Sequence, residues 1–256
     1  MANGLASPSS GSLASGAVNG SAVVGFDTAT EDTAVCVTRG GEVLREALLG
    51  LGSDGGPRHS TALLAEVERA AEVAGGWDGV RAIAVGLGPG SFTGIRIGIA
   101  TARGLGASTG LAVRGVGTLD ALARALAAHS DADGRSRLAV LDARRGEAFA
   151  ALYAATGERL WDPVVVSPED LAERVVQLSH PPLAAGSGAL RFRNELAARG
   201  VLVPDDADPV HRIAARHICA LADRQGSEDG AGLAPIYLRA PDAARWRERD
   251  TSKRAE

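Results

Sequence analysis

Two stretches of the chain follow the same pattern at a constant spacing. In each stretch an apolar strand ends in an aspartate, a tight turn follows, and a second apolar strand returns. The first stretch comprises residues 23–27 and 33–37, and the second comprises 138–142 and 148–152. The offset is 115 residues throughout, without a gap. This agreement favours a duplicated fold in which each half begins with an antiparallel hairpin.

Hydrophobic periodicity predicts the elements that follow each hairpin. In the first half we expect a third strand at 42–49, a helix at 58–74, a strand at 80–85, a helix reaching about residue 109 and a strand at 111–116. Thr118 is expected to cap the next helix. In the second half we expect a strand at 158–161, a helix from 168, a short strand before Gly186, and helices at 189–199 and from 209 to about 224.

A meander followed by helix, strand, helix and strand, and then repeated, is typical of the duplicated ribonuclease-H-like fold, also called the actin-like ATPase fold. The predicted class is therefore α/β, with two lobes that each contain a mixed sheet flanked by helices. We expect a flexible tail at 1–21, a first lobe at 22–116, a second lobe at 117–240 and a charged tail at 241–256.

Charge and composition narrow the possible functions. The net charge of −4 disfavours a chain that grips nucleic acid by itself. Cys36 and Cys219 form no CxxC pair, so we expect buried free thiols in a reducing compartment. Residues 1–21 lack the basic start and the apolar stretch of a secretory signal. No apolar run reaches the ~18 residues of a membrane span. The expected location is the cytoplasm.

The glycine-rich run at 86–98 follows a predicted strand and opens a helix. Free backbone N–H groups at a helix start favour an anion, although no P-loop lysine follows the glycines. Asp27, Thr28, Gly88 and Gly90 are thus candidates for a nucleotide or phosphate cleft, which Asp142 would face from the second half. The alternatives are that the glycines only make a tight turn and that Asp27 only caps its own turn. Ser91 is expected to be a helix N-cap rather than a nucleophile.

Small residues recur along the helix that this run opens, at Gly94, Gly98, Ala102 and Gly106. Each helical glycine costs about 1 kcal/mol relative to alanine, so tight packing must offset the loss. A neighbouring helix of the same lobe and a partner subunit are the two candidates for that packing. The predicted partner interface comprises Leu63, Val67, Gly94, Arg96, Gly98, Ala102, Arg103 and Gly106.

The sequence offers neither a metal site nor a catalytic group. The five histidines include no HxxxH or HExxH pair, and no nucleophile stands beside a base in a known motif. His59 is expected to be neutral and locally hydrogen-bonded, because a positive imidazole is disfavoured at a helix start. We therefore expect no catalytic residue and no metal.

Six motifs resemble those of the TsaB family, whose members are subunits of the bacterial machinery that makes threonylcarbamoyladenosine in tRNA. The resemblance extends from about residue 23 to 239. The motifs are Asp27-Thr28-Ala29-Thr30, Arg58-His59-Ser60, the run at 86–98, Gly115-Val116-Gly117-Thr118-Leu119, the run at 141–147 and Pro235-Ile236-Tyr237-Leu238-Arg239.

The resemblance implies a subunit without catalytic chemistry. The related TsaD transferase carries an HxxxH metal motif at the positions of Thr118 and Leu122, and neither residue replaces an imidazole ligand. The implied partners are a TsaD-like transferase, contacted through helices at about 58–74 and 92–109, and a TsaE-like ATPase. A homodimer through the same helices would compete with the transferase. The resemblance also implies tRNA contact only through the complex, no membrane, and no cofactor beyond weak nucleotide binding.

Two other functions stay open at the level of sequence. One is a small ATP-dependent phosphotransferase of the same superfamily, with a pocket completed near Gly186-Ser187-Gly188. The other is a peptidase, which the absence of a metal motif and of a nucleophile–base pair makes the weakest of the three.

Overall fold

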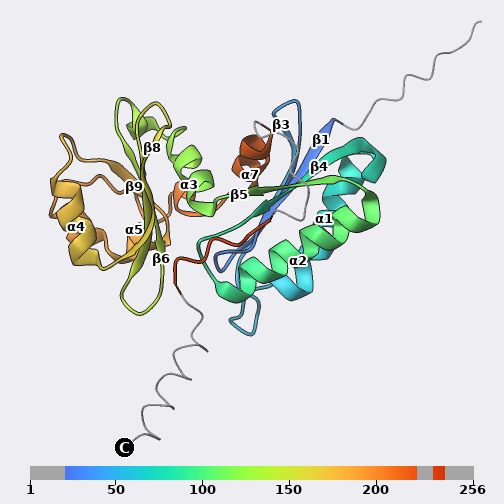
Figure 1. The fold of residues 1–256 in the computed structure, drawn as a ribbon, viewed down its shortest axis with the longest axis horizontal. Coiled ribbons are helices and arrows are strands. Elements are labelled where there is room, and N and C mark those ends of the chain that lie inside the picture. Colours follow the sequence, from blue (N-terminus) through green and yellow to red (C-terminus); the bar gives the residue numbers. More distant parts are fainter. Residues whose placement is uncertain (1–20, 224–232, 240–256) are drawn as a thin grey trace, which may run out of the picture.

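Two mixed β-sheets form the centres of two lobes in the computed structural model, which describes residues 21–223 and 233–239 (Figure 1). The first sheet has the order β3-β2-β1-β4-β5 and the second the order β8-β7-β6-β9. The strands of the first sheet are β1 (Ala22–Asp27), β2 (Thr33–Arg39), β3 (Glu42–Leu49), β4 (Val80–Gly86) and β5 (Ala112–Val116). Those of the second are β6 (Arg137–Asp142), β7 (Ala148–Tyr153), β8 (Arg159–Val166) and β9 (Leu183–Ala185). The predicted fold class is confirmed.

Helices cover both faces of each sheet. The α-helices are α1 (His59–Val73), α2 (Phe92–Thr109), α3 (Thr118–Leu126), α4 (Pro168–Val176), α5 (Ser187–Arg191), α6 (Arg193–Ala197) and α7 (Ala215–Ala222). The described residues also include three short 3-10 helices, η1 (Trp77–Gly79), η2 (Ser130–Ala132) and η3 (Pro209–His211). Within the described ranges, no helix is long and apolar enough to cross a bilayer.

Strand alternation explains how the first sheet supports two helical layers. Successive side chains of β1 point to opposite faces. Val24 and Phe26 pack with α1 and α2 on one face. Val23 packs on the other face, with Ile218 and Cys219 of α7. The helix α7, although it comes late in the sequence, therefore completes the core of the first lobe (Figure 1).

The two predicted buried thiols meet at this second face. Cys36 of β2 and Cys219 of α7 are both buried and free. The Cys219 Sγ lies 3.6 Å from the carbonyl oxygen of Cys36. Contact with the Cys219 thiol, together with burial, raises the pKa of Cys36. Their separation in the sequence concealed this contact.

The duplication is present in the strands, and the hairpin registers differ by one residue. β6 and β7 start 115 residues after β1 and β2, as the repeat predicts. Asp27 pairs with Ala34, whereas Asp142 pairs with Ala148 and not with Phe149. The second turn is tighter, and Arg144 and Arg145 adopt positive φ angles of 64° and 56°. The one-residue difference in register is therefore accommodated by a strained backbone in the turn between β6 and β7.

Several predicted helix boundaries were wrong. Gly117 is the N-cap of α3, and Thr118 is its first residue. The helix predicted at 189–199 is interrupted at Phe192, which separates α5 from α6. The helix predicted from 209 is a 3-10 turn, and α7 begins only after Ala214, whose ψ is 122°. The strand predicted at 158–161 extends to Val166.

The ends of the chain bear on the domain prediction. Predictions about residues 1–20 and 240–256 lie outside the described residues. The boundary between lobes at 116/117 stays a prediction. Both α7 and residues 233–239 contact the first lobe, with Leu233 buried in the core beneath α1 and α2.

Candidate functional site

The carboxylate of Asp27 ends β1 and is fully buried. Its Oδ1 accepts a hydrogen bond from the Ala29 backbone N–H (2.7 Å), and its Oδ2 accepts one from the Thr118 hydroxyl (2.7 Å). Burial raises the pKa of this carboxyl, while both hydrogen bonds act in the opposite direction. Asp27 therefore caps its own turn and ties it to the first turn of α3.

The glycine-rich loop between β4 and α2 packs closely against the turn between β1 and β2. A Cβ atom at Gly90 would overlap the Ala29 carbonyl oxygen, and one at Gly86 would overlap the Asp27 carboxylate. The Ser91 N–H donates to the Ala29 carbonyl (2.7 Å), and the Gly88 N–H donates to the Thr118 hydroxyl oxygen (3.2 Å). These glycines are needed where the hairpin turn approaches the loop. Nucleotide binding by Asp27, Thr28, Gly88 and Gly90 stays a prediction.

The small-residue stripe of α2 faces the same turn. A Cβ at Gly94 would overlap the Thr28 carbonyl oxygen, and one at Gly98 would lie 2.5 Å from the Thr28 Oγ1. The Thr28 hydroxyl in turn donates to the Gly94 carbonyl (2.8 Å). Ser91 caps the helix as predicted, accepting a hydrogen bond from the Gly94 N–H. The stripe therefore packs inside the first lobe.

The predicted interface residues divide by exposure. Leu63, Val67 and Ala102 lie in the first core, and Gly94 and Gly98 are buried against the hairpin turn. Arg96 and Arg103 are exposed, and Gly106 is half-buried. A partner that approached α2 would contact the exposed residues and not the buried stripe.

Two aromatic side chains outside the predicted partner interface lie near these arginines. Phe92 and Tyr237 are both exposed, and their ring centroids are 5.1 Å apart. The Arg96 guanidinium lies 4.9 Å from the Phe92 centroid, a cation–π geometry. Exposed aromatics are informative in a chain with only 4% aromatic residues. The only signal for Phe92 was its place directly after the N-cap.

His59 behaves as predicted for a neutral, locally bonded imidazole. Its Nδ1 accepts from the Thr33 hydroxyl (2.9 Å), and its Nε2 donates to the Thr30 carbonyl (3.1 Å). Burial lowers its pKa. The ring secures the first hairpin turn to the start of α1.

The turns of the two hairpins face each other. Arg144, in the turn after β6, donates to the Glu31 carboxylate in the turn after β1 (2.6 Å). Asp142 accepts two hydrogen bonds from Arg191, at 2.9 and 2.8 Å, and one from the Arg144 backbone N–H (2.8 Å). Arg144 thus brings the turn after β6 to the first hairpin, and the prediction that Asp142 faces a nucleotide cleft stays a prediction. The two aspartates have different partners: Asp142 is held by Arg191 of its own lobe, whereas Asp27 is held by Ala29 of its own turn and by Thr118 of α3.

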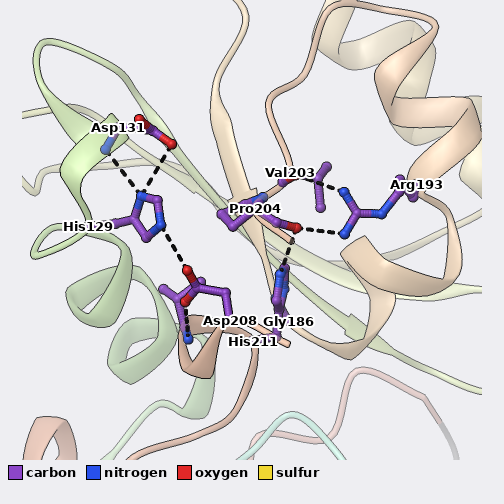
Figure 2. A network of polar contacts seen from close by, with 9 residues as sticks. His129, Asp131, Gly186, Arg193, Val203, Pro204, Asp208 and His211 are labelled. Carbon is purple, nitrogen blue, oxygen red and sulfur yellow. Dashed lines mark hydrogen bonds and ion pairs between the residues drawn. The ribbon is translucent and has the colours of Figure 1, made fainter. Parts of the chain in front are cut away.

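A histidine network secures the second lobe near Gly186 (Figure 2). The His211 Nδ1 accepts from the Gly186 N–H (3.2 Å), and its Nε2 donates to the Pro204 carbonyl (3.1 Å). Arg193 donates to the same carbonyl, and His129 reaches Asp208 (3.2 Å). Gly186 begins the turn at which the phosphotransferase alternative places its nucleotide pocket. Its backbone N–H is already hydrogen-bonded to the His211 imidazole.

The two residues expected at the positions of the transferase metal motif, Thr118 and Leu122, are both engaged in the fold. Thr118 binds Asp27 and Gly88, and Leu122 lies in the core of the second lobe. Among residues 21–223 and 233–239, no group of three or more His, Cys, Asp or Glu side chains is arranged to hold a metal ion.

Two lobes that each begin with an aspartate-ended hairpin, and that meet at the turns of those hairpins, define a protein of the actin-like ATPase fold class. Residues 54–206 match the family model described as "TsaD: tRNA N6-adenosine threonylcarbamoyltransferase". The TsaB protein of Escherichia coli is 35% identical over 65% of this chain and 71% of its own length. TsaB of Bacillus subtilis is 29% identical over 65% of this chain and 73% of its own.

Solved structures agree with these relatives. YeaZ from Pseudomonas aeruginosa is similar with a TM-score of 0.67 and 25% identity, over 85% of this chain and all of that one. A second Pseudomonas aeruginosa structure, described as similar to the peptidase YeaZ, has a TM-score of 0.68 and 27% identity over 86% of this chain. The chain belongs to the TsaB family of tRNA threonylcarbamoyladenosine biosynthesis proteins.

Proposed function

We propose that this chain is a cytoplasmic, non-catalytic subunit of the machinery that makes threonylcarbamoyladenosine in tRNA. It pairs with a TsaD-like transferase and helps to recruit a TsaE-like ATPase, and it meets tRNA only within that complex. Family membership supports the pathway. The observation that supports the non-catalytic part concerns Thr118 and Leu122, the residues expected at the metal-ligand positions of the transferase. The Thr118 hydroxyl is hydrogen-bonded to Asp27, and the Leu122 side chain is buried.

The activating mechanism is a shift of the transferase population toward its competent state. Such a shift requires that the subunit bind the competent state more tightly than the other states. The surface available for this on α2 includes Phe92, Arg96 and Arg103, since the small-residue stripe is packed internally. A homodimer through the same face would compete with the transferase and delay activation.

A reconstitution tests the proposal. The cognate transferase and ATPase subunits are supplied with tRNA, ATP and threonylcarbamoyl-adenylate, with and without this chain, and modified adenosine is measured. Product that requires this chain, while the chain alone yields none, supports a non-catalytic subunit. Equal product without the chain, or product from the chain alone, overturns the proposal. Thr118→Ser is a control for the role of residue 118. Serine keeps the hydroxyl and supplies no imidazole, so the variant should support the same amount of product as the parent.

The peptidase alternative is examined in the same preparation. Purified chain is incubated with a denatured protein substrate, and new amino termini are counted. We expect none above the level of a sample without the chain. Cleavage that copurifies with the chain and disappears when the chain is removed by antibody would contradict the proposal.

A further inference from the structure

Residues 233–239 run across the junction of the two lobes, and we call this segment the strap (Figure 1). At the first lobe Leu233 is buried in the core. Further along, the Ile236 N–H donates to the Leu87 carbonyl in the glycine-rich loop (2.8 Å). The strap is therefore attached to the same loop that leads into α2.

The strap also completes the exposed surface of α2. The Arg103 guanidinium donates to the Leu233 carbonyl (2.8 Å), which fixes the strap to the helix. The Tyr237 ring lies against Phe92, beside the guanidinium of Arg96. Tyr237 and Phe92 are both more than a third exposed, so this ring contact lies at the surface and not in the core.

Two residues further on, the strap reaches the second lobe. The Arg239 guanidinium donates to the Ala143 carbonyl (3.0 Å) and forms an ion pair with Glu147. Ala143 and Glu147 belong to the turn between β6 and β7, which also carries the Arg144 contact to Glu31. Arg239 is largely buried in this contact, with 18% of its side chain exposed.

We propose that the strap couples the position of the second lobe's first turn to the exposed surface of α2. When the turn between β6 and β7 moves, Arg239 moves with it because of its contacts with Ala143 and Glu147. Tyr237, two residues earlier in the strap, is then displaced from its position on α2. Its bearing on partner binding rests on the proposed function, because the α2 surface is the face offered there to the transferase. The coupling within the chain stands without it.

The contacts of Arg239 hold the end of the strap in a way that can be reversed. Charge-assisted hydrogen bonds are stronger than neutral ones, so Arg239 holds the end of the strap. Glu147 is 40% exposed, so solvent and salt weaken its part of the contact. Between Leu233 and Arg239, the hydrogen bond from the Ile236 N–H to the Leu87 carbonyl attaches the strap backbone to the first lobe. Loss of the Arg239 contacts therefore frees Tyr237 before it frees Leu233.

Amide hydrogen exchange in the full chain tests the coupling. In Arg239→Ala we expect the Ile236 and Tyr237 amides to exchange about tenfold faster, the change that follows loss of a charge-assisted hydrogen bond. The matched control is Arg191→Ala, which removes an ion pair with Asp142 at the end of the same hairpin and does not touch the strap. It should leave these two amides within about twofold of the parent.

Unchanged exchange in Arg239→Ala overturns the proposal, because Arg239 then does not fasten the strap. Equal acceleration in both variants also overturns it, since a general loosening of the hairpin would be the cause. The midpoint of thermal unfolding is recorded for each variant to confirm that both are folded.

Titration with the transferase tests the consequence for the partner. We expect Arg239→Ala and Tyr237→Ala to weaken binding by at least about fivefold, and Arg191→Ala to bind like the parent. Faster exchange of the strap amides together with unaltered binding overturns the link to the partner. If the parent chain itself fails to bind, the proposed function fails, and the exchange result still decides the coupling.

Discussion

Single residues in this protein serve more than one part of the chain. Thr118 is a clear case: its hydroxyl donates to Asp27 and accepts from the Gly88 N–H, while its own N–H donates to the Gly88 carbonyl (2.8 Å). One threonine thus joins β1, the glycine-rich loop and α3. Because all of these groups are buried, each depends on its partner to offset desolvation.

Replacing Thr118 with valine should destabilise the protein by about 2–3 kcal/mol, because it leaves a buried carboxylate oxygen and the Gly88 N–H without a partner. Urea unfolding followed by circular dichroism measures the loss. Thr118→Ser keeps the hydroxyl and should cost less than about half as much. Equal losses in the two variants would show that the methyl group, and not the hydroxyl, matters.

Asp27→Asn should change how stability depends on pH. The folded pKa of Asp27 is raised above its ordinary value of 3.8, mainly by burial. The folded state therefore favours the protonated form. Its stabilising contribution is fully present below pH 3.8, and is lost as the pH rises through the folded pKa.

The parent should accordingly lose stability relative to Asp27→Asn across that window, by at most about 1.4 kcal/mol per pH unit. The measurement is the difference in unfolding free energy between the two proteins from acid to neutral pH. The same change at Asp54, which lies in an exposed loop, controls for the substitution itself. A difference that grows in the opposite direction would contradict the role of burial.

The sequence predicted the location of Asp27 but not its role. Its place at a strand end followed from the pattern, and the choice between a ligand site and a cap of its own turn stayed open. The structure shows the cap. The bond to Thr118 joins residues 91 positions apart, and no local pattern indicates a hydrogen bond over such a distance.

At the scale of elements, α2 shows why one glycine cannot be treated like another. Gly98 lies against the Thr28 side chain, whereas a Cβ at Gly104 would meet nothing within 4 Å. Both lie in the same helix, so their intrinsic preferences are alike. Their surroundings alone separate them.

Gly98→Ala should therefore destabilise the protein by about 1–3 kcal/mol through overpacking, and Gly104→Ala should stabilise it by up to about 1 kcal/mol. Thermal unfolding of the two variants beside the parent is the measurement. The same direction of change in both would contradict this account. It also follows that a bulky residue at Gly98 would disturb the fold itself, so it cannot serve as a test of partner binding.

Elements were predicted well where one amphipathic pattern ran without interruption, as in α1, α2 and α4. They were predicted poorly in the helical segments that follow β9. There the apolar residues of 187–197 and 209–222 repeat at helical spacing across breaks at Phe192 and Ala214. The backbone leaves the helical region at both positions, with φ −107° and ψ 28° at Phe192 and φ −96° and ψ 122° at Ala214. Helical spacing of apolar residues does not indicate such breaks, because local propensity is a weak guide to the final structure.

At the scale of the whole molecule, α7 closes the first lobe. It lies beside α3 at the junction of the two lobes and packs its apolar side on β1, β2 and β4 (Figure 1). Arg216 and Arg212 add ion pairs to Glu46 and Asp32 of the first lobe. The stability of the first sheet thus depends on residues almost 200 positions away in the sequence.

Ile218→Ala should cost about 2–4 kcal/mol, because Ile218 is fully buried against the first sheet. Amide exchange in β1 should accelerate as that lobe loosens. Val176→Ala in α4 is the control, since Val176 is 52% exposed and should cost less than about 1 kcal/mol. A loss confined to the second lobe would contradict the assignment of α7 to the first.

This arrangement has a consequence for the protein during its synthesis. The ribosome delivers β1, β2 and β4 early, but the helix that covers one face of their sheet is not made until residue 222. Until then Val23, Cys36 and Ala84 present an uncovered apolar face while residues 117–214 are being translated. The nascent chain therefore passes through a long interval in which it offers a binding surface to chaperones, and a stalled ribosome would leave a first lobe that cannot complete its core.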